Sequence, residues 1–381
     1  MSAPDTRFTR VVAMEGGAAP AGGEVLEAPL PLSARPGEDA TAPVTFGQYF
    51  EAVIRMLSGP GEVLLRRAVG AALSCPGPYK GLITEVEIRS ERHGAFYHPA
   101  RIRAVTGDGP ALLAGNVAVS PSGLALVESE GKLLTALSGQ APSGLPALYG
   151  TARAPLDQGR ETRMLLVEWF EDFSEFHLDG GGGISVWDDD RGHFTLGPDR
   201  AAGVYEAAGR ILALYYDPDT ALGVTGWNQA AGDFVARVDG NGTQVRLVTA
   251  RALGSLTEPG DVLSDAFWFV LNTSLRLRLD RVLGTGPWGL AGDWSVAPIL
   301  RGLLAGLSAR AARTGRHPDL SRNLLELLSG LGEERLEAAC RVLAGSCDPC
   351  RSETSLLAAC ATAHGQALGS LFQAESPDLW G

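Results

Sequence analysis

The sequence predicts an α+β fold in which strands come early and helices dominate the later part of the chain. Short runs rich in β-branched residues cluster between residues 82 and 169. After residue 200, apolar residues instead recur at helical spacing over long segments. The chain has 381 residues, which is enough for two domains, because single hydrophobic cores stop growing below about 300 residues. We therefore expect a small strand-rich domain followed by a mostly helical one.

Composition and charge argue against several classes of partner. A hydrophobic share of 45% and a charged share of 20% are typical of a soluble globular protein. The formal net charge of −12 disfavours nucleic acid and anionic membranes, because both attract clustered Lys and Arg. The first residues lack a signal-peptide pattern, and no stretch stays apolar for the ~20 residues that a membrane span needs. We expect a cytoplasmic protein with no nucleic-acid or membrane partner.

The first part of the chain is predicted to be a flexible segment followed by a helical hairpin. Residues 1–43 are rich in Ala, Gly, Pro and Glu without sustained periodicity, which indicates a flexible N-terminal segment. Within residues 44–78, apolar residues recur at helical spacing from Phe46 to Leu57. Gly59-Pro60-Gly61 then separates a second short helix.

Residues 79–170 are predicted to form the strand-rich domain with one main helix at 123–137. The expected strands are a hairpin over 82–105, then 111–119, 145–152 and 163–169. Residues 171–381 are predicted to form the helical domain with a C-terminal helical extension, and the segment 168–173 would be the hinge. The glycine run 180–183 is expected to be a flexible insert. The expected helices are 201–216, 261–283, 295–313 and two more ending near residue 373.

One stretch carries a recognisable order of elements. An apolar helix leads to Gly232-Asp233-Phe234-Val235, and a turn-linked pair of short strands follows. This order resembles the aminoglycoside-phosphotransferase and lipopolysaccharide-kinase branch of the protein-kinase-like superfamily, over roughly residues 82–283. The strings HGAFYHPAR and AAGDFV also resemble those of a group of bacterial proteins. The resemblance implies a bilobal fold with a small antiparallel sheet and one main helix in the N-lobe, and a mostly helical C-lobe.

The resemblance also implies a catalytic loop, and several of its charged positions have changed. Asp233 would be the base that accepts a proton from the substrate hydroxyl. The loop histidine is replaced by Ala231, the metal-binding asparagine by Val238 and the second metal-binding aspartate by Thr249. Because Mg²⁺ prefers charged oxygen ligands, these residues disfavour a magnesium site. The alternative for Asp233 is a structural role, in which its carboxylate accepts backbone N–H groups and fixes the loop.

The nucleotide contacts implied for the N-lobe are altered as well. Ser120 stands where the phosphate-binding lysine belongs, and Glu130 stands where the helix partner of that lysine belongs. Only two of the 32 cationic residues are lysines, Lys80 and Lys132, so a shifted alignment does not restore the lysine. ATP is the implied nucleotide, and its implied contacts are Arg92, His93, Gly94, Ser120, Glu130, Glu168, Arg246 and Thr249.

Some of these residues have simpler interpretations. The loop with Arg92, His93 and Gly94 could bind an anion, with His98 and neighbouring arginines, or could be a hairpin turn whose aromatics cover the sheet. Arg237, Arg246 and Arg251 would replace a metal as anion partners, or would be ordinary surface arginines. Cys347-Asp348-Pro349-Cys350 has the spacing of a zinc or redox pair, but structural zinc normally needs two such pairs.

Two functional hypotheses follow from the sequence. The first is a pseudokinase-like protein with degenerate catalytic motifs that binds a nucleotide, a small anionic ligand or a protein partner. The second is an active ATP-dependent phosphotransferase acting on a small-molecule hydroxyl, such as that of a sugar or an aminoglycoside, with Asp233 as base. A third possibility is a purely structural assembly protein, because the apolar helix from Asp265 to Asp280 would pack inside its domain or form the face of a homodimer.

Overall fold

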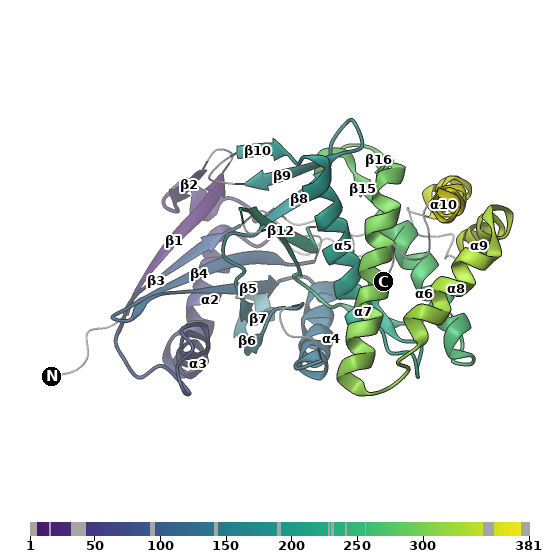
Figure 1. Cartoon of the computed structure of the whole chain (residues 1–381). Helices are drawn as coiled ribbons and strands as arrows, with labels where there is room; N and C mark the ends of the chain where they lie inside the picture. Colours follow the sequence, from purple (N-terminus) through teal and green to yellow (C-terminus); the bar gives the residue numbers. More distant parts are fainter. Residues whose placement is uncertain are drawn as a thin grey trace. The chain divides into compact units, whose positions relative to one another are not determined.

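The computed structural model describes residues 6–14, 17–31, 43–91, 96–140, 144–188, 192–227, 229, 232–240, 242–255, 257–345 and 354–374. The chain divides into two compact units. Unit 1 comprises Met1–Ser138 and Pro146–Glu171, and unit 2 comprises Gly139–Leu145 and Asp172–Gly381. The predicted α+β class is confirmed, with a large sheet in unit 1 and the longest helices in unit 2 (Figure 1).

Unit 1 is built on a seven-stranded sheet with the order β2-β1-β3-β4-β5-β7-β6. Its neighbouring strands are antiparallel, except that β1 and β3 run parallel. The order of three strands, one helix and two strands, predicted for a kinase-like N-terminal lobe, is confirmed by β3 to β7 with α4 (Pro121–Leu137). The strands are β1 (Arg7–Met14), β2 (Gly17–Pro20), β3 (Ile83–Ser90), β4 (His98–Thr106), β5 (Gly109–Ala118), β6 (Leu148–Pro155) and β7 (Glu161–Glu168).

Helices pack on both faces of this sheet. The predicted hairpin is α2 (Phe46–Leu57) and α3 (Glu62–Ala72), and a capping box between Thr45 and Gln48 fixes the start of α2. The two helices share one hydrophobic core with the sheet face that carries Met164 and Leu166. Because side chains alternate along a strand, Leu165 points to the opposite face, where it meets Gly131 of α4. A short helix, α1 (Glu24–Glu27), precedes the hairpin.

The prediction of a flexible N-terminal segment is wrong for the part that the structure describes. Strand β1 adds to the edge of β3, and β2 then pairs with β1. Phe8 and Val12 pack against the core of unit 1. The high Ala, Gly and Pro content of residues 1–43 hid this short alternating run, whose stability comes from pairing with a strand more than 70 residues away.

Unit 2 contains a sheet with the order β10-β9-β8-β12-β13, in which β12 and β13 are the turn-linked pair predicted after Asp233 and β8 to β10 were not predicted. The glycine run predicted to be a flexible insert is the turn of the β8–β9 hairpin. The Asp179 carboxylate accepts hydrogen bonds from the backbone N–H groups of Gly181 and Gly183, both at 2.8 Å, so the run forms an ordered turn. The strands are β8 (Ser174–Leu178), β9 (Ile184–Asp188), β10 (Gly192–Thr195), β12 (Phe234–Asp239) and β13 (Gly242–Leu247).

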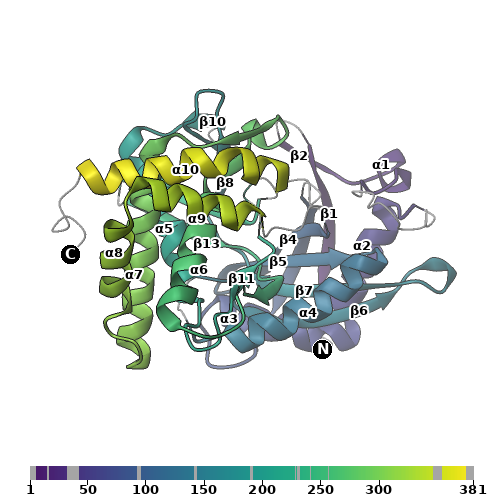
Figure 2. The same cartoon turned by 90° about the vertical axis from the view of Figure 1, so that its right-hand side faces the viewer.

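The helices of unit 2 pack closely on one another. Helices α5 and α7 lie side by side (Figure 1), and a Cβ at Gly302 of α7 would lie 2.0 Å from the Glu206 carbonyl oxygen of α5, so only glycine permits this approach. Three helices follow α7 among the described residues, whereas two were predicted, and α9 and α10 pack together (Figure 2). The helices are α5 (Pro198–Leu214), α6 (Val262–Leu277), α7 (Val296–Thr314), α8 (Leu320–Leu331), α9 (Glu333–Gly345) and α10 (Thr354–Ala374).

Two small strand pairs complete unit 2. They are β11 (Gly223–Thr225) with β14 (Ala252–Gly254), and β15 (Leu279–Arg281) with β16 (Trp288–Leu290). The first pair brackets the Asp233 loop in sequence, and the second carries Asp280, whose contacts are described below.

Candidate functional site

The loop before β12 places Asp233 at the start of a strand and holds it in the interior of unit 2. Gly232 has a φ of +68°, and a Cβ there would lie 2.4 Å from the Glu175 carboxylate oxygen Oε1. The positive φ favours glycine, and any other residue here would require the Glu175 side chain to move. The backbone carbonyl of Asp233 accepts from the Val248 N–H at 2.8 Å, which continues the β12–β13 ladder to this residue. The backbone of the predicted catalytic residue is therefore part of the sheet of unit 2.

The Asp233 side chain makes a bidentate ion pair with Arg251. Its Oδ1 and Oδ2 accept from Nη2 and Nη1 of Arg251, both at 2.5 Å. The side chains are only 2% and 12% exposed. Arg251 Nη1 also donates to the Gly226 carbonyl at 2.7 Å. This parallel arrangement is the strongest geometry that a guanidinium offers a carboxylate, and it neutralises the negative charge of Asp233.

The other predicted residues of unit 2 lie on or just beyond β12 and β13. Val238 is buried within β12, where its apolar side chain provides no oxygen ligand. Thr249 is buried just beyond β13. Arg246, on β13, places its guanidinium 5.0 Å from the ring centroid of Phe173, and Arg237 of β12 approaches the same ring at 5.2 Å. Two arginines thus share one aromatic ring through cation–π contacts.

In unit 1, the predicted residues have structural partners. Ser120 is the N-cap of α4, where its Oγ accepts from the Gly123 N–H at 3.2 Å. Glu130 is fully buried, and its Oε2 accepts a hydrogen bond from the Tyr97 hydroxyl. The phenol thus contacts the carboxylate that a lysine would meet in the resembled family. Glu168 ends β7, and its carboxylate accepts from the Ala147 N–H at 3.2 Å.

Several predicted residues lie outside the described part of the chain, namely Arg92, His93, Gly94, Ala231, Cys347 and Cys350. Their neighbour His98 is described and is buried, and it contacts the Ser90 hydroxyl at 2.5 Å and the ring of Tyr49. The suggestion that His98 binds an anion is therefore wrong, because its imidazole is part of the core of unit 1.

A row of charged side chains that the sequence analysis missed lies next to the Asp233 loop. His177 of β8 contacts Asp280 of β15 through Nδ1 at 3.2 Å and Glu175 through Nε2 at 3.7 Å. Burial on its own would lower the pKa of His177, but the hydrogen bonds and charges of the two carboxylates outweigh it and raise the pKa to about 9. His177 is therefore an imidazolium at neutral pH, with a carboxylate on each side.

A second buried network joins α10 to the C-terminal end of α6. Arg278 Nη1 donates to His364 Nδ1 at 3.0 Å, and the Ser274 hydroxyl contacts His364 Nε2 at 2.9 Å. Burial, together with the charge of Arg278, lowers the pKa of His364 to about 3, so the imidazole is neutral. Arg278 also pairs with Asp293 at 2.7 Å. No local sequence pattern could have revealed this network, because its members are brought together only by helix packing.

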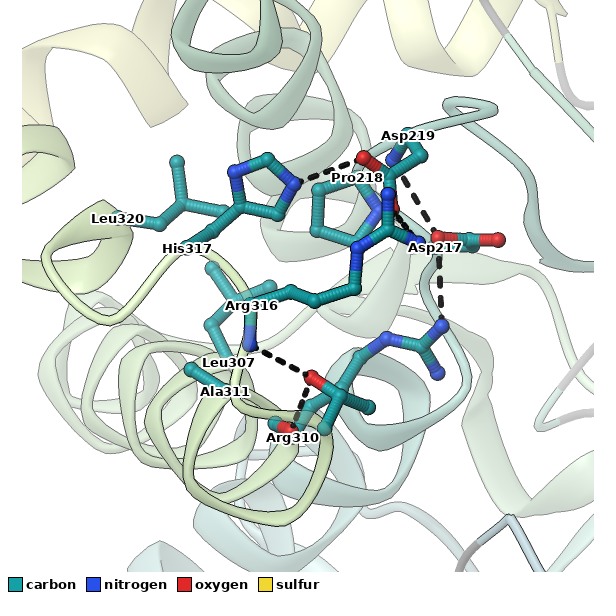
Figure 3. A pocket seen from close by; sticks show the side chains of 10 residues that line it. Asp217, Pro218, Asp219, Leu307, Arg310, Ala311, Arg316, His317 and Leu320 are labelled. Atoms are coloured by element: carbon teal, nitrogen blue, oxygen red, sulfur yellow. Dashed lines mark hydrogen bonds and ion pairs between the residues drawn. The ribbon is translucent and has the colours of Figure 1, made fainter.

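A cavity in unit 2 lies between the loop after α5, the end of α7 and the start of α8 (Figure 3). Its charged groups are paired with one another: Arg310 with Asp217 at 3.3 Å, Arg316 with Asp219 at 2.6 Å, and His317 with Asp219 at 2.9 Å. The hydrogen bond from His317, with the charge of Arg316, lowers the pKa of Asp219. The two arginine and two aspartate charges cancel, so this cavity offers a phosphate group no net positive charge.

Two absences among the described residues bear on ligands and membranes. Among them, no group of three or more His, Cys, Asp or Glu side chains is arranged to hold a metal ion. No helix in the described ranges is long and apolar enough to cross a bilayer.

The comparisons with known proteins do not assign the chain to a family. No protein-family model matches the chain, and no curated protein does. One solved structure to which the chain is similar is that of WaaP in complex with acyl carrier protein. The match has a TM-score of 0.30 and 11% sequence identity, and it covers 63% of this chain and 88% of the other. At this TM-score and identity, the match gives no information on activity.

Proposed function

We propose that this protein is a kinase-like-fold protein that binds a ligand or partner at the Asp233 loop without transferring a phosphoryl group. The observation that carries the proposal is the bidentate pair between Asp233 and Arg251. A catalytic base must present an oxygen lone pair to the substrate hydroxyl within hydrogen-bond distance. In this loop both carboxylate oxygens are engaged by one guanidinium, and the carboxylate is almost fully buried.

The chemistry of phosphoryl transfer supports the same conclusion. Its catalysis depends on positioning the phosphates and neutralising their charge, which metal ions and a lysine normally do. The metal positions hold Val238 and Thr249, neither of which carries charge, and the lysine position holds the helix cap Ser120. The fold has therefore kept the loop but lacks the groups that would make it catalytic.

One feature of the loop favours binding over a purely structural role. The side-chain oxygen of Gln229 is buried and meets no hydrogen-bond donor within the described residues. A buried acceptor of this kind normally has a partner, because leaving it without one costs about 1–3 kcal/mol. A ligand donor at this loop would supply that partner.

The alternative is an active phosphotransferase in which an incoming phosphate takes Arg251 away from Asp233 and frees the base. Arg251 is the observation in its favour, because guanidinium groups bind phosphate and carboxylate in the same bidentate manner. The alternative requires the nucleotide to offset the cost of separating a buried ion pair.

Thermal-shift measurements with ATP, with and without Mg²⁺ or Mn²⁺, distinguish the two functions. A ligand at 100 times its dissociation constant stabilises a protein by about 2.7 kcal/mol, which is readily measured. We expect no metal-dependent shift and no release of ADP. A metal-dependent shift that disappears in Asp233→Asn, together with ATP consumption, would establish the enzyme instead. Asp233→Asn keeps a hydrogen-bond acceptor for Arg251, and Arg237→Gln is the matched control.

A further inference from the structure

The row of charges on β8 and β15 ends at the backbone of the Asp233 loop. Asp280 and Glu175 lie on either side of His177, at 3.2 and 3.7 Å. On its far side, the Glu175 carboxylate occupies the space next to Gly232, where a Cβ would lie 2.4 Å from Oε1 and 2.8 Å from Cδ. A continuous line of contacts therefore runs from β15 to the residue immediately before Asp233.

The buried end of the row is fixed by backbone and ring contacts. The Asp280 carboxylate accepts from the N–H groups of Leu178 at 3.0 Å and Arg281 at 2.8 Å. On the other side, the Trp187 ring lies 4.6 Å from the His177 ring, and His193 stacks on Trp187. Two further titratable groups lie near Asp280: the Arg278 guanidinium and the Tyr205 hydroxyl. His177 therefore has little freedom to leave the row.

The position of Glu175, at the exposed end of the row, depends on the positive charge of His177. The Glu175 side chain is 49% exposed, so water competes for its carboxylate. Without a neighbouring cation, nothing described in the contacts of Glu175 would keep it against Gly232. The positive charge of His177 supplies the attraction, and Asp280 keeps that charge in place.

We propose that Glu175, held by His177 and Asp280, is a positioning residue that fixes Gly232 and thereby sets the position of Asp233. Its consequence for ligand binding rests on the proposed function, because it concerns the same loop. The position of the loop is then sensitive to the charge of His177.

The sign of the pH effect follows from the raised pKa of His177, about 9 against an ordinary value of 6.5. The stabilisation is fully present below pH 6.5 and is lost as the pH rises through about 9. Above that pH, the carboxylates of Asp280 and Glu175 lie beside a neutral imidazole. His177 then no longer attracts Glu175 to its position next to Gly232.

Pulsed hydrogen exchange of the backbone amides of residues 232–240, corrected for intrinsic rates, tests the proposal between pH 7 and 10. In the wild type we expect protection to fall at least tenfold as the pH passes about 9. Glu175→Gln should reduce protection of this segment already at pH 7 and flatten its pH profile. Glu334→Gln, an exposed residue on α9, is the matched control and should match the wild type.

Two results would overturn the proposal. In the first, Glu175→Gln shows the same protection and the same pH profile as the wild type. In the second, Glu175→Gln loses protection equally throughout unit 2, which would indicate general destabilisation. His177→Gln, which removes the cation, should reproduce the effect of Glu175→Gln on residues 232–240. The measurement uses no ligand, so metal-dependent ATP turnover would refute the proposed function and leave this result intact. Conversely, unchanged exchange would refute the positioning role alone.

Discussion

Two buried carboxylates, one in each unit, occupy positions that the family resemblance assigns to nucleotide chemistry, and the protein satisfies them differently. Glu130 in unit 1 accepts from the neutral hydroxyl of Tyr97, whereas Asp233 in unit 2 pairs with the guanidinium of Arg251. A phenol satisfies a hydrogen bond but brings no charge, and a guanidinium does both. The comparison teaches that a buried carboxylate can become part of the core with a phenol hydroxyl as donor, as at Glu130, or with a guanidinium, as at Asp233.

The largest expected loss of stability comes from removing the Arg251 guanidinium in unit 2. Arg251→Ala leaves the buried Asp233 carboxylate without its counter-charge, and breaking a buried pair from one side costs about 3–5 kcal/mol. Equilibrium urea unfolding followed by tryptophan fluorescence would measure the loss. Adding Asp233→Asn removes the uncompensated charge and should restore more than half of the stability.

The control for this experiment is Arg237→Ala. Arg237 is a third exposed and lies 3.6 Å from Asp239, so the loss should stay below about 1 kcal/mol. If Arg251→Ala cost no more than Arg237→Ala, the carboxylate of Asp233 would not depend on its guanidinium, and the contrast with Glu130 would disappear.

A smaller loss of stability is expected from removing the Tyr97 hydroxyl in unit 1. Tyr97→Phe deletes one hydrogen bond to the buried Glu130, which is worth about 1.5–3 kcal/mol when the acceptor is charged. The same urea experiment applies, with Glu128→Gln on the exposed face of α4 as the control; it breaks only exposed ion pairs with Lys132 and Arg163, so its loss should stay below about 1 kcal/mol. A loss larger than that of Arg251→Ala would reverse the order that the comparison predicts.

The smallest effect on stability is expected at Ser120, where the family resemblance implies a lysine. Ser120→Ala removes the N-cap of α4, the helix that carries Glu130, and should cost about 1 kcal/mol. Ser129→Ala, at an exposed position inside the same helix, should be neutral or slightly stabilising, because alanine is the better helix former. Equal behaviour of the two variants would mean that Ser120 does not act as a cap.

Much of the fold could be predicted because its signals are local. The order from β3 to β7, the helix α4 and the hairpin of α2 and α3 each follow from periodicity within a short window. Strands β1 and β8 to β10 could not be predicted in this way. Strand β1 depends on a distant partner edge, and the β8–β9 turn is ordered by Asp179, whereas the glycine content alone indicates a linker.

The candidate site was predictable only in part, for the same reason. Asp233 is visible from its Gly-Asp motif, and Arg251 was noted as a cation near it, but sequence alone does not reveal that the two form a closed pair. His177 and Asp280 are 103 residues apart, and neither lies in a recognisable motif. Their contact depends on how β8 packs against β15, and no short stretch of the sequence gives information on that packing.

The buried contact between Arg278 and His364 also bears on how the chain is made. The two residues are 86 positions apart, so a ribosome adding 5–20 residues per second delivers the imidazole roughly 4–17 s after the guanidinium. During that interval, Arg278 has an incomplete set of partners, because α10 has not yet been synthesised. Unit 1, which ends at Glu171, can fold long before this point. The packing of unit 2 around Arg278 is therefore incomplete while the chain is being synthesised. A chaperone would be expected to bind there.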